Sequence, residues 1–97
     1  MSVTEAQPAG GAFAVEEAWQ LNPQVALRDE SFGALAYHYG NRRLVFLKSR
    51  LLVELVSSLC DYPSATEAIA AVVPEGQHDS YRRALARLAA SEVIDAR

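Results

Sequence analysis

The sequence predicts a single α+β domain in which a three-stranded antiparallel sheet is followed by three helices. Two observations carry this prediction. Apolar side chains alternate with a period of two along residues 25–47, and after residue 48 they recur with the 3.6-residue period of a helix. A length of 97 residues, 51% of them hydrophobic, suits one such domain with a core of its own.

Three short strands are expected in the first half of the chain. The first is centred on Ala26 and ends at the polar residues 28–31. The second covers residues 32–39, whose large apolar side chains fall at every other position, and Gly40-Asn41 then favours a turn. The third covers residues 43–47, so the last two strands are expected to form a hairpin.

Three helices are expected after the hairpin, each with a sequence signal at its start. Ser49 is placed to cap the first helix, and Ser64 and Glu67 have the spacing of a capping box for the second. Either Asp79 or Ser80 is expected to begin the third. The predicted apolar faces are Leu51, Leu52, Leu55, Val56 and Leu59, then Ile69, Val72 and Val73, then Tyr81, Ala84, Leu85, Leu88 and Ala89, with Val93 and Ile94 as a terminal apolar plug.

The N-terminal segment, residues 1–18, is expected to be a flexible tail, either disordered or loosely docked, ahead of a domain that covers residues 19–97. It is rich in Ala and Gly and carries only acidic charge. It lacks the basic flank and the apolar run of a secretory signal, and no stretch approaches the roughly 20 apolar residues of a membrane span. A cytoplasmic protein is therefore expected.

Residues that could support catalysis or metal binding do not converge in the sequence. His38 and His78 are far apart without metal-ligand spacing, and each is expected to face solvent or to be hydrogen-bonded. Cys60, the single cysteine, excludes an intramolecular disulfide and is expected to be a small buried hydrophobe. Phosphate-binding glycine loops and hydrolase motifs are missing. The sequence therefore predicts a protein that is not an enzyme and binds no cofactor or metal.

Three helices beside a small sheet also fit a winged-helix protein, so a small nucleic-acid-binding regulator is an alternative function. The third helix carries Arg82, Arg83 and Arg87. A net charge of −3 opposes binding to phosphates, however, and the arginine helix lacks an Asn or Gln to read bases. We therefore expect no nucleic-acid partner. A permanent structural subunit of a larger enzyme is a second alternative.

Recognition of another polypeptide is the remaining class of function, and the second strand of the hairpin is its candidate site. Residues 43–47 contain no proline, so their backbone could pair with an added strand. Their side chains alternate, with Leu44 and Phe46 on one face. The same composition fits an edge that the fold itself covers. Four positive charges within nine positions would steer an acidic segment toward this strand: Arg42, Arg43, Lys48 and Arg50.

Several segments of the chain resemble a known family. They are Trp19-Gln20-Leu21-x-Pro23-x-Val25-x-Leu27-Arg28, Phe32-Gly33-Ala34-Leu35-x-Tyr37, Arg42-Arg43-Leu44-x-Phe46-Leu47, Leu51-Leu52 and Ser64-x-x-Glu67-x-Ile69. From about Trp19 to the C-terminus the chain resembles the peptide chaperones of mycofactocin biosynthesis, which belong with the PqqD-like recognition elements of ribosomally made, modified peptides (RiPP recognition elements). It departs from them at Ser91-Glu92, where many relatives place a glycine.

The resemblance implies a winged-helix-like, PqqD-type fold and a binding function. Such a protein binds the leader of the mycofactocin precursor peptide by strand addition and presents it to a radical S-adenosylmethionine maturase, without a cofactor of its own. The leader would lie between the third strand and the third helix. The residues implied for peptide binding are Arg43, Leu44, Val45, Phe46 and Leu47 on the strand and Tyr81, Leu85 and Leu88 on the helix, of which Leu85 fits a core position at least as well.

Overall fold

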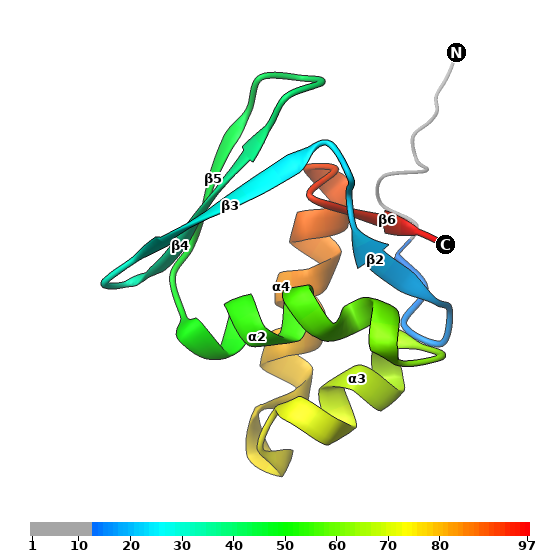
Figure 1. Cartoon of the computed structure of the whole chain (residues 1–97). Helices are drawn as coiled ribbons and strands as arrows, with labels where there is room; N and C mark the ends of the chain where they lie inside the picture. The colour runs from blue at the N-terminus through cyan, green and yellow to red at the C-terminus, as the bar shows by residue number, and fades with distance from the viewer. Residues whose placement is uncertain (1–12) are drawn as a thin grey trace.

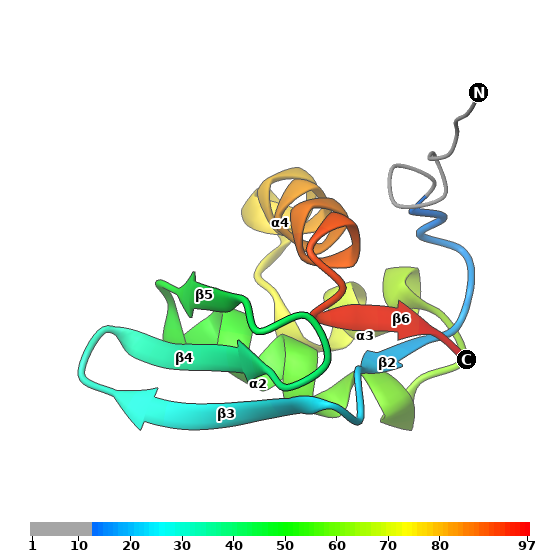
Figure 2. The ribbon, with the colours of Figure 1, turned by 90° about the horizontal axis from the view of Figure 1, so that it is seen from above.

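The predicted three-stranded sheet and three helices are both present in the computed structural model, which describes residues 13–97 (Figure 1). Helix α2 (Arg50–Ser58) packs directly on the sheet, and α4 (His78–Ala90) lies to the side of the sheet, where it packs against α3 (Ala65–Val72) and β6 (Ile94–Ala96) (Figures 1 and 2). The elements in chain order are β2 (Trp19–Leu21), β3 (Val25–Glu30), β4 (Gly33–His38), β5 (Leu44–Leu47), α2 (Arg50–Ser58), the 3-10 helix η1 (Leu59–Asp61), α3 (Ala65–Val72), the 3-10 helix η2 (Glu75–Gln77), α4 (His78–Ala90) and β6 (Ile94–Ala96).

Strands β3, β4 and β5 form an antiparallel sheet with β4 at its centre. The alternation predicted for the hairpin is confirmed, because one face is buried against the helices and the other carries the exposed apolar side chains. Alanine at the inward positions of β4 lets α2 pack directly on this strand. The inward positions of the hairpin are Ala34, Ala36, Val45 and Leu47, and the outward positions are Leu35, Tyr37, Leu44 and Phe46.

The first strand of this sheet is longer than the sequence predicts. Residues 28–30 were expected to end it, but β3 continues through them and pairs with residues 33–35 of β4. The turn follows at Ser31 and Phe32. Arg28 and Asp29 are exposed, so their polar side chains remain solvated while the backbone keeps its ladder, and polarity alone did not break the strand.

A second sheet of two short strands was not predicted. β2 pairs antiparallel with β6, which brings Trp19 opposite Ala96 and Leu21 opposite Ile94. Strands of three residues are too short for an alternating pattern to be recognised in the sequence. The pair also connects segments near the two ends of the described chain, which the sequence does not relate to each other. The sheet holds Ile94 in the core, next to the buried Val93, so the predicted apolar plug at the C-terminus is confirmed.

The segment before β2 is packed on the domain where it is described. Residues 1–12 of the expected flexible tail lie outside the described residues. The ring of Phe13 lies 4.8 Å from that of Trp19, measured between centroids, and the carbonyl of Val15 accepts a 2.9 Å hydrogen bond from the backbone N–H of Thr66. The last part of the expected tail is therefore docked on the domain, because Phe13 and Val15 bury apolar surface against the core.

The helix starts follow the predicted caps in two of three cases. The Ser49 hydroxyl accepts a hydrogen bond from the N–H of Leu52, and that of Ser64 accepts one from the N–H of Glu67, both at 3.1 Å. Helix α4 instead begins at His78, one residue before the earlier of the two expected starts. The 3-10 helix η2 leads directly into it, so no side-chain cap is made there.

Cys60 is exposed, which contradicts the prediction of a small buried hydrophobe. Helix α2 ends at Ser58, and the chain then tightens into η1. A 3-10 helix turns by about 120° per residue instead of about 100°, so the position after the buried Leu59 rotates off the apolar face. The thiol of Cys60 lies 3.9 Å from the carboxylate of Asp61.

Helix α4 ends in a Schellman motif with a glutamate in the left-handed position. Glu92 has a φ of 64°, and its N–H donates to the carbonyl of Ala89 at 3.1 Å. The N–H of Val93 donates to the carbonyl of Leu88 at 2.9 Å, which completes the motif. The departure at Ser91-Glu92 therefore keeps the turn, but it places a side chain where glycine is favoured.

Glu92→Gly is expected to stabilise the domain by about 1 kcal/mol, because glycine adopts the left-handed conformation without steric cost. In thermal unfolding this corresponds to a rise of about 4–8 °C for a domain of this size. Glu92→Ala is the matched control, since it also removes the carboxylate that accepts a 3.3 Å hydrogen bond from Asn41 but keeps the strain. A glycine variant no more stable than the alanine variant would contradict the strain at this position.

Candidate peptide-binding cleft

Strand β5 lies at the edge of the three-stranded sheet, with β4 as its one partner strand among the described residues (Figure 2). The N–H of His38 donates a 2.9 Å hydrogen bond to the carbonyl of Arg43. Hydrogen-bonded pairs alternate along antiparallel strands, so the backbone groups of Val45 face β4. Those of Leu44 and Phe46 face the outer edge, where no strand of residues 13–97 pairs with them.

A cleft of about 480 Å³ lies between this edge and helix α4. In Figure 2, α4 lies on the β5 side of the sheet, away from β3. One wall comes from the end of β5 and the start of α2, and the other from η2 and α4. The lining residues are Phe46, Lys48, Ser49 and Leu52 on the first wall and Gln77, Ser80, Tyr81, Ala84 and Arg87 on the second.

Two of the three helix residues implied by the resemblance do not line the cleft. Tyr81 does line it, but Leu85 is fully buried and Leu88 is only 5% exposed, so both pack in the core and are corrected out of the candidate site. The cleft is lined instead by a neighbouring row of residues along α4, which includes Ala84 and Arg87. Both rows have helical spacing in the sequence, so the spacing could not show which one faces outward.

The two walls are joined by a hydrogen bond between side chains. The Ser49 hydroxyl lies 2.8 Å from the hydroxyl of Tyr81, and it also accepts the N–H of Leu52 as the cap of α2. One serine therefore fixes both the start of α2 and the position of α4 relative to the end of β5. The cap could be predicted from the sequence, but this second contact could not, because the two residues are separated by 32 positions.

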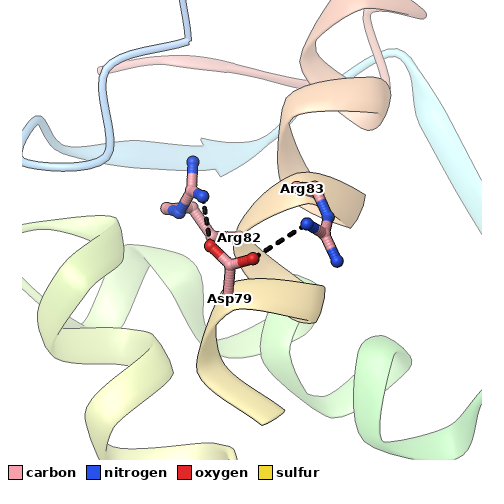
Figure 3. A network of polar contacts seen from close by, with 3 residues as sticks. All are labelled: Asp79, Arg82 and Arg83. Carbon is pink, nitrogen blue, oxygen red and sulfur yellow. Dashed lines mark hydrogen bonds and ion pairs between the residues drawn. The ribbon is translucent and has the colours of Figure 1, made fainter.

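The cleft carries positive charge from Lys48 and Arg87, and none of the described residues that line it has a carboxylate. The other two arginines of α4 are held elsewhere. Figure 3 shows Arg82 and Arg83 reaching the carboxylate of Asp79 in the first turn of the helix, with the Arg83 ion pair at 2.9 Å. The hydrogen bond from Arg82, together with the charges of both arginines, lowers the pKa of Asp79.

The basic residues expected to steer a partner are exposed around the ends of β5. Arg42 and Arg43 lie in the loop before the strand, and Lys48 and Arg50 lie after it. Lys48 also lines the cleft, whereas the guanidinium of Arg50 is 3.5 Å from the carbonyl of Glu30. The structure therefore keeps Arg42, Arg43 and Lys48 near the ends of β5, whereas the Arg50 side chain reaches toward β3 at the other edge of the sheet.

Both histidines are hydrogen-bonded, as expected. His38 is buried, and its Nδ1 accepts the N–H groups of residues 40–41 at 3.0 and 3.1 Å, which holds the hairpin loop. The Nε2 of His78 donates to the carbonyl of Val73 at 2.8 Å. Within residues 13–97, no three side chains of the His, Cys, Asp or Glu type gather as metal ligands would. The helices in that range are also too short or too polar to cross a bilayer.

Comparison with known proteins identifies the family. The model of the peptide chaperone MftB family matches residues 18–95, a span that contains β5, the cleft and α4. The chain belongs to the MftB family. The MftB protein of Mycobacterium ulcerans (strain Agy99) is 44% identical over 91 residues, which cover 93% of this chain and 84% of the relative. The MftB protein of Mycolicibacterium smegmatis (strain ATCC 700084 / mc(2)155) is 47% identical over 83 residues, which cover 84% of this chain and 81% of the relative.

These MftB relatives are named as peptide chaperones, which is also the description of the family model. A peptide chaperone is not an enzyme, which confirms the expectation from the sequence that this chain is not one. The MftB protein of Mycobacterium tuberculosis (strain ATCC 25618 / H37Rv) is 45% identical over 83 residues, covering 84% of this chain and 76% of the relative. No solved structure is significantly similar to the chain.

Proposed function

We propose that this MftB chain binds the leader of the mycofactocin precursor peptide as an added strand on β5 and presents it to a radical S-adenosylmethionine maturase. The observation that carries the proposal is a strand edge that no other strand of residues 13–97 covers, beside a cleft, since strand addition supplies the backbone bonds and a pocket supplies specificity. The family's chaperone role supports it. Because the precursor is made by ribosomes, we place the complex in the cytoplasm.

Apolar side chains of the leader must supply most of the affinity. Ordering a flexible peptide costs about 1–2 kcal/mol per residue, whereas each new backbone hydrogen bond contributes only about 1 kcal/mol net. Burying one large aliphatic side chain contributes about 1.5–3 kcal/mol. Two or three such anchors against Leu52, Phe46 and Tyr81 would offset the cost of ordering about five residues.

The cleft also indicates the charge of the leader. Lys48 and Arg87 line it without a carboxylate from the described residues beside them. A leader segment that carries an acidic residue among its apolar ones would pair with these cations, while a basic segment would be repelled. The leader chemistry that fits is therefore an extended, acidic and apolar segment.

Filling the cleft is expected to weaken leader binding by at least about tenfold in a calorimetric titration with the synthetic precursor peptide. Ala84 lines the cleft and is partly buried, so Ala84→Trp places an indole where a leader side chain would pack. Ala90→Trp on the same helix is the matched control, because Ala90 is exposed and does not line the cleft. Equal affinities for the two folded variants would contradict the proposed site.

Reversing the charge beside β5 is expected to slow leader association. Arg42→Glu with Arg43→Glu should lower the association rate by about tenfold at low ionic strength and much less in high salt, where charges are screened. Stopped-flow mixing measures this rate. The matched control is Arg82→Glu with Arg83→Glu, because these side chains are paired with Asp79 and lie outside the cleft. If both pairs of substitutions lowered the association rate equally, or if the decrease did not depend on salt, electrostatic steering of the leader by Arg42 and Arg43 would be contradicted.

A nucleic-acid-binding role is less well supported by the same structure. A recognition helix presents cations to phosphates, but two of the three arginines of α4 are paired with Asp79. The third, Arg87, lines the cleft instead of a basic helix face. Peptide binding accounts for the position of this arginine, and nucleic-acid binding does not.

A further inference from the structure

The face of the sheet that points away from the core is apolar and open to solvent. We define the outer face as Phe32, Leu35, Tyr37, Tyr39, Leu44 and Phe46. The four exposed large hydrophobic side chains of residues 13–97 all belong to it: Phe32 is 42% exposed, Leu44 and Phe46 are each 54% exposed, and Tyr39 is 62% exposed. An apolar patch gathered on one face marks an interaction site, whereas scattered apolar residues do not.

The outer face is a continuous surface that spans the hairpin. The rings of Phe32 and Phe46 lie 5.9 Å apart, and those of Tyr37 and Tyr39 lie 5.0 Å apart, both measured between centroids. The cross-strand pairs of β4 and β5 join these two aromatic contacts along the strands. In Figure 1 the loop between β4 and β5 projects beyond the helices, which leaves this part of the hairpin accessible.

The charge around the outer face differs in sign from that of the whole chain. Residues 25–50, which form the sheet, its loops and the start of α2, contain five Arg or Lys and two Asp or Glu, a net charge of +3. The complete chain carries −3. Two copies of the outer face would bring like charges together, so self-association is disfavoured, and a partner with an acidic rim is favoured.

We infer that the outer face is the docking surface for the enzyme that modifies the bound peptide, and that this enzyme presents an apolar surface with an acidic rim. The inference rests on the proposed function. A leader added to the edge of β5 occupies that edge and the cleft, so it leaves the outer face free. Phe46 belongs to both the outer face and the cleft, so an enzyme on the outer face would lie beside the leader.

The test removes apolar surface from the outer face at positions outside the cleft. Phe32→Ser with Tyr39→Ser does so at two exposed side chains, neither of which lines the cleft or belongs to β5. The matched control is Phe32→Leu with Tyr39→Phe, which keeps the surface apolar. Binding of each full-length chain to the purified radical S-adenosylmethionine maturase is measured by calorimetry in the presence of the precursor peptide, and peptide binding alone is measured separately.

The serine pair is expected to bind the maturase at least about tenfold more weakly, with peptide affinity unchanged within about twofold and the control pair close to the native chain. Unchanged maturase binding by the serine pair would overturn the inference. A loss of peptide affinity that parallels the loss of maturase binding would also overturn the inference. A native chain that is a dimer, and that the serine pair converts to a monomer, would overturn it as well. A native chain that binds no peptide would instead contradict the proposed function, so the two failures are distinguishable.

Discussion

Leu44→Pro is expected to abolish leader binding while the domain stays folded. The N–H of Leu44 faces the free edge of β5, so proline removes a donor that the leader would use but that β4 does not. Its ring would also stand against the incoming strand. Edge positions of this kind tolerate proline, and the Leu44 side chain itself is half exposed, so the cost to folding is small.

The loss of affinity should exceed about tenfold, because a lost hydrogen bond and a steric conflict act together. A calorimetric titration with the precursor peptide measures it, and circular dichroism confirms the fold. Leu44→Ala separates the backbone effect from the side chain and should bind nearly as the native chain does. Val45→Pro should behave differently, since the N–H of Val45 faces β4 and its loss breaks the hairpin. A folded Leu44→Pro variant with native affinity would contradict strand addition.

Gly33→Ala is expected to destabilise the domain by about 3 kcal/mol or more. Gly33 has a φ of 149°, and a Cβ built there would lie 2.1 Å from the carbonyl oxygen of Leu47 and 2.9 Å from the N of Ser49. Both contacts are with backbone, which cannot move without shifting the end of β5 and the start of α2. Residues that carry a Cβ rarely adopt this backbone conformation, and the clash of the new Cβ with the backbone of Leu47 and Ser49 adds to the strain.

Denaturant unfolding measures this change in the free energy of unfolding. Gly76→Ala is the matched control, because a Cβ at Gly76 meets no atom within 4 Å, and it should change stability little. The Gly33 variant should also bind the leader poorly, since Lys48 and Ser49 of the cleft lie at the displaced junction. Equal stability of the two variants would show that the close approach of β4 to this junction is not required.

Periodicity predicted the elements that bury a face. The β4–β5 hairpin and helices α2 to α4 each pack one side of a regular element into the core, so their apolar positions repeat with the period of the element. The β2–β6 pair has three residues in each strand and shows no such repeat. Cys60 was placed wrongly because the helical period changes at η1, which composition does not show.

The strand side of the candidate site could be predicted from the sequence, and the helix side could not. The strand side of the site could be predicted because an edge strand must contain backbone groups free to pair. On the helix side, Leu85 and Leu88 continue the apolar stripe that begins at Tyr81, and burial takes that stripe into the core. The helix side of the cleft also includes polar positions such as Ser80 and Arg87, which look like ordinary solvent-facing residues in the sequence.

Amide hydrogen exchange of the chain, free and saturated with the leader, tests strand addition most directly. The backbone N–H groups of Leu44 and Phe46 face the free edge and should exchange rapidly in the free chain. They should become protected when the leader pairs with β5, while the N–H of Val45, already bonded to β4, should change much less. Protection at Leu44 and Phe46 is the predicted result. Saturation with the leader without protection at either amide would contradict the central claim.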